Sequence, residues 1–178
     1  MGVNIQHSDI LEGVRREEEM ESSSAGTNVT EEWEPMAAIE ETNKELVRRS
    51  NDEIWGDGNL DLIEGYVADD YVEHNAASPQ PIHGPEGYKE NVQMVRSAFP
   101  DLEVTTEDLI AEGDKVVTRY TLRGTHEGEL MGIEPTGKTV EVQGISFGKL
   151  KDGMIVEGWS IIDSMGMMQQ LGVVDTPA

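Results

Sequence analysis

The sequence predicts an α+β fold in which three N-terminal helices pack across the concave face of a curved, mostly antiparallel sheet. Two observations predict it. Helical apolar spacing dominates the chain before residue 100, and long β-type runs separated by turn residues follow it. Helices and strands segregated in this way are typical of α+β domains. The longest runs, at about 7–12 residues, are also long enough to curve.

The strands are predicted from alternation of apolar and polar residues and from turn signals. They are expected at residues 102–112, 115–123, 139–150 and 154–162, with a short extended piece at 71–75. Asp152-Gly153 supplies the positive φ that a tight hairpin needs between the last two strands. Gly113-Asp114 is expected to turn the first pair.

The helices follow from apolar residues at helical spacing. Ile39, Leu46 and Ile54 lie on one stripe, which predicts a helix from about Pro35 to Gly56. A short helix is expected at 60–67, and a third opens at Pro85. The last helix is short, and Asp163 or Ser164 is expected to cap it.

The ends of the chain read differently from its centre. Residues 1–35 combine an acidic run with few apolar side chains, a composition typical of disorder. We therefore predict a disordered acidic tail at 1–35, a folded domain at 36–173 and a disordered end at 174–178.

The charge is strongly acidic. Thirty-six Asp and Glu against thirteen Lys and Arg leave a net charge of −23. Phosphate contacts need clustered Lys and Arg, so nucleic acid and anionic membranes are not expected partners. Such a surface fits adaptation to a salt-rich cytoplasm, in which repulsion is screened, or an ordinary acidic protein.

Two absences bound the chemistry and the location. The chain has no Cys, which excludes disulfides, a thiol nucleophile and thiolate metal sites. It has neither an apolar run near the roughly 20 residues of a membrane span nor the apolar core of a signal peptide. A cytoplasmic protein is therefore expected.

Strand parity predicts two different sheet faces. Ser146 and Ser160, with small and apolar neighbours, suit the concave side. Ile145, Phe147 and Trp159, among charged residues, suit an outer face that a partner copy covers, so a homodimer or a higher homo-oligomer is expected. A β-bulge would invert part of this assignment. The residues given to the concave side are Val140, Val142, Gly144, Ser146, Gly148, Leu150, Met154, Val156, Gly158, Ser160 and Ile162.

Few polar side chains are candidates for chemistry. His74 with Asn75 lies where the helices meet the sheet and is read either as a donor to a ligand carbonyl or as a loop pair that bonds its own backbone. His126 either faces the pocket mouth or stabilises a turn. No spacing of His and carboxylates resembles a metal site, and no metal or cofactor is expected. No G-x-S-x-G elbow is present, so acyl-enzyme chemistry is not indicated.

Several ordered words extend over about 130 residues of the chain. From residue 40 to 172 it resembles the SnoaL-like polyketide cyclases, or ester cyclases, of the nuclear transport factor two-like superfamily. The words stand at residues 70–75 (DYVEHN), 83–87 (HGPEG), 124–128 (GTHEG), 132–138 (GIEPTGK), 152–159 (DGMIVEGW) and 163–172 (DSMGMMQQLG).

The resemblance implies a cone-shaped fold with a closed pocket and a cofactor-free aldol condensation on a polyketide ester. In that family an Asp after the strand's Trp acts as general acid and base. Here Ser160 follows Trp159, Gly158 stands where the family often has His, and Ser146 aligns with another family His. The family's proton carrier is therefore missing, and Asp163 substitutes for it only if a bulge turns it inward.

Three hypotheses follow. The first is acid/base catalysis on a small apolar carbonyl compound, with Asp163 and His74 as proton carriers. The second is a non-catalytic small-molecule binding protein, and the third is a dimeric association module. The residues predicted to line the ligand site are Asn75, His126, Ser146, Met154, Trp159, Ser160 and Ile162.

Overall fold

The computed structural model describes residues 29–75 and 80–175. The chain divides into two units at Pro35, and the fold described below is that of the unit from Met36 onward. Its sheet has six strands in the order β2-β1-β6-β5-β4-β3. The strands are β1 (Val67–Asn75), β2 (Ile82–His83), β3 (Glu103–Glu112), β4 (Lys115–Thr125), β5 (Thr139–Lys151) and β6 (Met154–Ile162).

The sheet is antiparallel except at one junction. The strands β3 to β6 form a meander in which each strand pairs with the next. The strand β1 returns beside β6 in parallel, with Glu73 in register with Gly158 and Asn75 in register with Ser160. The first strand thereby lies next to the last. Glu73 and Ser160, which meet across this pair, are 87 residues apart in the sequence.

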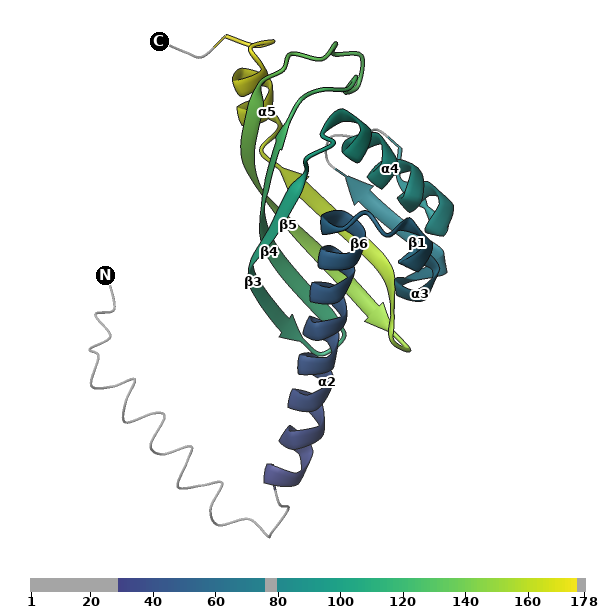
Figure 1. Ribbon diagram of the computed structural model, residues 1–178. Helices are drawn as coiled ribbons and strands as arrows, with labels where there is room; N and C mark the ends of the chain where they lie inside the picture. Colours follow the sequence, from purple (N-terminus) through teal and green to yellow (C-terminus); the bar gives the residue numbers. More distant parts are fainter. Residues whose placement is uncertain (1–28, 76–79, 176–178) are drawn as a thin grey trace, which may run out of the picture. The chain divides into compact units, whose positions relative to one another are not determined.

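Helices cover one face of this sheet (Figure 1). They are α2 (Val29–Ser50), a π-helical continuation η1 (Asn51–Gly56), a 3₁₀ turn η2 (Leu60–Leu62), α3 (Ile63–Tyr66), α4 (Gly84–Ala98) and α5 (Ser164–Leu171). The helix α4 contacts β1 and β2, η1 contacts β3, and α5 contacts β5. We call the covered side the inner face and the opposite side the outer face.

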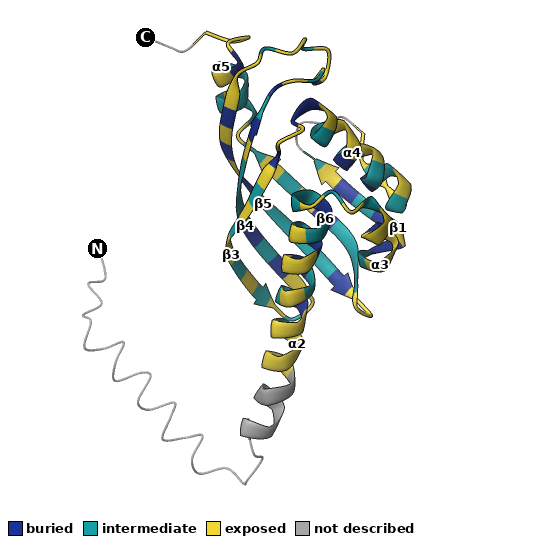
Figure 2. Cartoon of the chain, in the orientation of Figure 1, coloured by how far each residue is buried: buried dark blue, intermediate teal, exposed yellow. Residues whose placement is uncertain are grey.

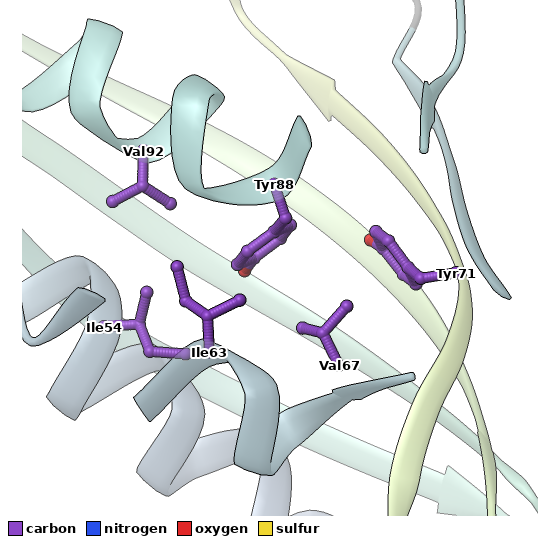
Figure 3. Close-up of a cluster of buried hydrophobic side chains, with 6 residues drawn as sticks. All are labelled: Ile54, Ile63, Val67, Tyr71, Tyr88 and Val92. Carbon is purple, nitrogen blue, oxygen red and sulfur yellow. The ribbon is translucent and has the colours of Figure 1, made fainter. Parts of the chain in front are cut away.

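The inner face carries the buried apolar residues of the strands, as the sequence pattern predicts (Figure 2). Val116, Val140, Val142 and Leu150 are each less than a tenth exposed. Ile54 of η1 and Val92 of α4 pack with Tyr71 and Tyr88 in one cluster (Figure 3). Burying such side chains contributes roughly 1.5–3 kcal/mol each and fixes the helices on this face.

The predicted elements agree with the structure, with changes at their boundaries. The strand predicted at 71–75 begins four residues earlier, at Val67, because the chain leaves α3 directly into the sheet. The first helix begins at Val29, within the stretch predicted to be a tail. Residues 1–28 and 176–178 lie outside the described residues, so the disorder predicted there stays a prediction.

The hairpin between β5 and β6 turns as predicted. Asp152 and Gly153 have φ values of 52° and 76°, a pair of left-handed residues. A shift in the register follows between Lys149 and Leu150, where Leu150 pairs with Ile155 and Lys151 with Met154. The shift corrects the predicted face of Met154, because this bulge turns Ile155 into the core and leaves Met154 opposite Lys151.

Two glycines of the inner face lie under tyrosines. A Cβ at Gly144 would stand 2.5 Å from the Tyr120 hydroxyl oxygen, and a Cβ at Gly158 would stand 2.5 Å from the Tyr71 hydroxyl oxygen. The phenols therefore occupy the space above these glycines. The small residues of the predicted concave set leave room for tyrosine side chains at these two positions.

The tight contact at Gly158 gives a testable expectation. Gly158→Ala is expected to lower the free energy of unfolding by about 1–3 kcal/mol, the typical cost of overpacking. In a Tyr71→Phe background the cost is expected to shrink, because the next nearest Tyr71 atom, Cζ, is 3.4 Å from the added Cβ. Urea unfolding of the four proteins of this double-mutant cycle measures the difference. Equal costs in both backgrounds would contradict the contact.

Candidate functional site

The inner face carries a row of polar side chains across four strands. Strand register places Thr118 of β4 opposite Ser146 of β5, and Ser146 opposite Ser160 of β6. Asn75 of β1 is in register with Ser160. Residues in register share a face of the sheet, so these side chains point into the same region. Apolar residues surround them, since Val116, Val142 and Leu150 lie on the same face.

At one end of this row lies a buried carboxylate, Glu73. It is two residues before Asn75 on β1, so it shares the inner face, and it is only 7% exposed. The Ser160 hydroxyl donates to Oε1 of Glu73 at 2.8 Å, and the Tyr71 hydroxyl donates to Oε2 at 3.4 Å. A buried ionisable group held by two hydroxyls is the strongest candidate for acid/base chemistry in this fold.

Two opposing effects act on Glu73. Burial raises the pKa of this carboxyl above its ordinary value, because the charged form loses its hydration. The hydrogen bonds from Ser160 and Tyr71 oppose this rise, since they stabilise the carboxylate. A carboxyl whose pKa is raised, and whose charged form is still hydrogen-bonded, can both accept and return a proton.

Three tyrosines stand around this carboxylate. Burial raises the pKa of Tyr71 and Tyr88, and the negative charge of Glu73 raises both further. Burial first, and Glu73 second, raise the pKa of Tyr120 to about 12. Tyr88 lies edge-on to Tyr71, with ring centroids 5.7 Å apart (Figure 3), and accepts a hydrogen bond of 2.7 Å from Trp55. The phenols therefore stay protonated, as hydrogen-bond donors, at neutral pH.

The structure brings together four of the residues predicted for the site. Ser146, Ser160 and Asn75 lie in the polar row, and Ile162 pairs with Gly144 on the same face. Their contact with a ligand stays a prediction.

His74 and Trp159 lie on the other face. His74 comes one residue after Glu73, and Trp159 comes one residue before Ser160. Because side chains alternate along a strand, both point away from the inner face. Their rings stack with centroids 5.2 Å apart, and the His74 Nε2 atom lies 3.3 Å from a Glu157 oxygen. The His74 side chain is 44% exposed. The structure thus separates His74 from Glu73 by the thickness of the sheet.

Asp163 is occupied as a helix cap. It follows the end of β6, and its Oδ1 accepts from the backbone N–H of Gly166 at 2.8 Å. The cap predicted for the last helix is therefore confirmed. The residue is exposed and no bulge turns it toward Ser160, so it does not join the polar row.

His126 is buried and holds a turn. Its Nδ1 accepts from the Thr136 backbone N–H at 3.2 Å, and its ring packs against Phe99. Its Nε2 has no partner among the residues that the structure describes. Of the two predicted roles for His126, the geometry favours the stabilisation of a turn, at the end of β4 and away from Glu73.

The sequence prediction missed Glu73. Its neighbours in the word at 70–75 drew attention to the histidine and asparagine, and Glu residues are frequent in this chain. One signal was present: in alternation Tyr71, Glu73 and Asn75 form one set, and Tyr71 is a residue that strands bury. Parity alone does not say which set faces inward.

The outer face carries an exposed apolar group. Ile145 pairs with Ile161 and Phe147 with Trp159, and Ile161 is 66% exposed. Glu157 and Lys149 lie beside them. The predicted homodimer through this face, like the predicted tolerance of salt, stays a prediction.

Over residues 29–75 and 80–175 no three His, Cys, Asp or Glu side chains are grouped as a metal ion requires. In the same part of the chain, no helix is both long and apolar enough to cross a membrane.

Known proteins are similar to this chain in sequence. The profile of the SnoaL-like polyketide cyclases matches residues 45–171. Aklanonic acid methyl ester cyclase AcmA of Streptomyces galilaeus is 30% identical over 122 residues, which cover 67% of this chain and 84% of that protein. Nogalonic acid methyl ester cyclase of Streptomyces nogalater is 30% identical over 117 residues, covering 65% and 87%.

Solved structures agree. A Jannaschia sp. CCS1 protein assigned to the SnoaL-like polyketide cyclases superposes with a TM-score of 0.71 at 30% identity, covering 78% of this chain and 96% of that one. TsrD of Streptomyces laurentii superposes with a TM-score of 0.67 at 27% identity, covering 75% and 96%. The fold and the profile match define the class: this chain belongs to the SnoaL-like polyketide cyclase family.

Proposed function

We propose that this chain carries out cofactor-independent acid/base chemistry on a small, largely apolar carbonyl compound, with Glu73 as its proton carrier. The single observation behind this is the buried Glu73 carboxylate, which accepts a hydrogen bond from Ser160. Ser160 stands where the family's Asp is expected. The Glu73 carboxylate, on the neighbouring strand β1, lies within hydrogen-bond distance of Ser160 and is the carboxylate next to that position.

The proposed step is proton abstraction next to a carbonyl group. The C–H bond breaks, its proton moves to a Glu73 oxygen, and its electron pair passes into the carbonyl, which becomes an enolate. Return of the proton gives exchange or isomerisation. Attack of the enolate carbon on a second carbonyl of the same molecule forms a C–C bond, and the alkoxide that results takes the proton from Glu73. Both routes restore the Glu73 carboxylate.

The surroundings of Glu73 suit this task. Burial raises the pKa of the carboxyl above its ordinary value, which makes it a stronger base. The Ser160 hydroxyl holds one oxygen in place and leaves the second lone pair of that oxygen available. The β-dicarbonyl C–H of a keto ester is already acidic, so one positioned carboxylate is sufficient. The curated relatives carry methyl ester cyclase in their names, which supports keto esters as the first substrates to test.

A non-catalytic binding protein is the second candidate. One observation favours it: the Ser160 and Tyr71 hydroxyls occupy one lone pair on each Glu73 oxygen, an arrangement that also suits a purely structural carboxylate. A dimeric association module is the third hypothesis, and the apolar outer face is what it rests on.

Exchange of α-protons separates these candidates. The protein is incubated with a panel of β-keto esters in deuterated buffer, and NMR follows both the exchange and the protein resonances. Exchange above the buffer rate that is lost in Glu73→Gln supports the proposal. Exchange that survives Glu73→Gln but is lost in His74→Ala or Asp163→Asn refutes the assignment to Glu73. Shifted inner-face resonances without exchange mean a binding protein.

A further inference from the structure

Strand β4 presents two hydroxyls to the inner face that bond to nothing in the described part of the chain. Thr118 is 0% exposed, and its Oγ1 has no hydrogen-bond partner there, although Ser146 lies opposite. The Tyr120 phenol likewise forms no hydrogen bond with residues 29–75 or 80–175. A buried hydroxyl without a partner costs roughly 1–3 kcal/mol, so the Thr118 hydroxyl calls for an explanation.

Tyr120 leans over the middle of the sheet. Its hydroxyl and Cζ atoms would lie 2.5 and 2.4 Å from a Cβ on Gly144, so the ring crosses from β4 to lie over β5. Tyr71 leans over β6 from the opposite side, with its hydroxyl above Gly158. Ser146 and Ser160 are paired on the sheet between the positions that the two phenols cover.

The two phenols differ in what they bind. Tyr71 donates to Glu73, whereas Tyr120 has no acceptor of its own in the described chain. Tyr120 nevertheless lies close enough for the charge of Glu73 to raise its pKa. The site thus has a base with its hydroxyl partners on one side and an unused donor on the other.

We propose that Tyr120, with the Thr118 hydroxyl of the same strand face as a second donor, donates a hydrogen bond to the oxygen of a bound enolisable carbonyl compound and stabilises the enolate that forms. This deepens the acid/base function proposed above and rests on it. The substrate class is narrowed to compounds whose acidic C–H faces Glu73 while a carbonyl oxygen of the same unit faces β4. Tyr120 would then be a catalytic residue, because it touches the atom on which negative charge develops.

The balance of the step is unchanged by this assignment. Glu73 takes the proton and the carbonyl oxygen takes the electron pair. Tyr120 keeps its own proton and shares it through the hydrogen bond. A phenol whose pKa is raised to about 12 stays a neutral donor throughout the neutral range. Such a donor stabilises an enolate more than the ketone, because hydrogen bonds to charged acceptors are stronger.

The first experiment compares Tyr120→Phe with Tyr66→Phe in the full chain. Tyr66 is a matched control, since its phenol binds Glu53 outside the polar row. With a β-keto ester, Tyr120→Phe is expected to lower kcat for α-proton exchange by about 10²-fold while KM changes little, as for the loss of one oxyanion donor. Tyr66→Phe is expected to retain the parent values.

The second experiment needs no turnover. Pentane-2,4-dione is bound to the protein, and its ultraviolet absorbance follows conversion of the bound diketone to its enolate as pH rises. Tyr120→Phe is expected to move this ionisation to higher pH. In a Glu73→Gln background, Tyr120→Phe is expected to move the ionisation of the bound diketone in the same direction, because the Tyr120 donor is still present there. An unchanged ionisation in Tyr120→Phe would overturn the inference.

The two experiments separate failure of the inference from failure of the proposed function. Loss of exchange in Glu73→Gln with parent-like exchange and ionisation in Tyr120→Phe refutes the role of Tyr120 and leaves the function of Glu73 standing. An absence of exchange in the parent protein refutes the function, and the diketone ionisation then decides on Tyr120 alone.

Further variants guard against a variant that fails to fold. Gly144→Ala keeps the phenol but displaces it, because the new Cβ collides with the Tyr120 ring. Gly144→Ala is expected to lower the rate of α-proton exchange, as Tyr120→Phe does. Thr118→Val removes the unpartnered hydroxyl at constant shape and is expected to raise the melting temperature while weakening diketone binding. A Thr118→Val protein that binds the diketone as the parent does would contradict the role of Thr118 as a second donor.

Discussion

Glu73→Gln is expected to lower the rate of α-proton exchange by about 10²–10⁴-fold, the usual contribution of a general base. The variant keeps the shape of the side chain and an oxygen that accepts from Ser160, so the fold is expected to remain. NMR exchange rates over a range of pH are the measurement. In the parent protein the rate is expected to rise with pH through the raised pKa of Glu73 and then to level off.

Two control variants sharpen this result. Glu157→Gln removes a carboxyl from the outer face of β6, beside His74, and is expected to leave exchange unchanged. Glu73→Asp keeps the charge but withdraws it by one methylene, so it is expected to retain part of the rate. Loss of exchange in Glu157→Gln together with normal exchange in Glu73→Gln would move the chemistry to the outer face.

Glu73→Gln is also expected to change how the free energy of unfolding depends on pH. The folded state raises the pKa of Glu73 above its unfolded value of about 4.3, so the native state holds its proton longer. Its stabilising contribution is therefore full below that unfolded value and is lost as pH rises through the folded pKa. Glu73→Gln is expected to remove this slope and to raise the free energy of unfolding at pH 7, by urea unfolding.

Ser160→Asp is expected to destabilise the protein by about 3 kcal/mol or more at pH 7, the order of an uncompensated buried charge. It places an Asp where the resemblance to the family implies one. The Ser160 Oγ lies 2.8 Å from Glu73, however, so the new carboxylate would face an existing one. Like charges at this distance raise one pKa strongly, and the pair is expected to share a proton. The variant is thus not expected to recover a second independent base.

The pH dependence identifies the cause. Near the acid end both carboxyls are protonated, so the stability of Ser160→Asp is expected to approach that of the parent and to fall as pH rises through the raised pKa of the pair. Ser160→Asn is the matched control, because it has the shape of Asp without its charge. An equal loss of stability in Ser160→Asn would show that shape, and not charge, opposes an Asp at this position.

Much of the fold follows from local sequence. The four strands of the meander were predicted within three residues at each end, because alternation and the Asp152-Gly153 turn are local signals. The resemblance to the SnoaL-like family predicted the family that the profile match shows. Placement of Ser146 and Ser160 with the buried inner-face residues was likewise predicted by parity.

The candidate site was less predictable, for three physical reasons. The bulge after Lys149 puts Ile155, in place of Met154, on the inner face, and no sequence pattern predicts the position of a bulge. His74 was interpreted either as a donor to a ligand carbonyl or as part of a loop pair, but it lies in a strand whose parity turns it outward onto Trp159. Asp163 follows β6, where capping α5 satisfies its carboxylate.

The sequence by itself determined the acidic composition and the order of helices and strands, since these are properties of local pattern and residue identity. Only the tertiary structure decided that Glu73 stands beside Ser160. The parallel pairing of β1 with β6 joins segments 87 residues apart, and a contact between distant segments leaves no mark in the local spacing of either one.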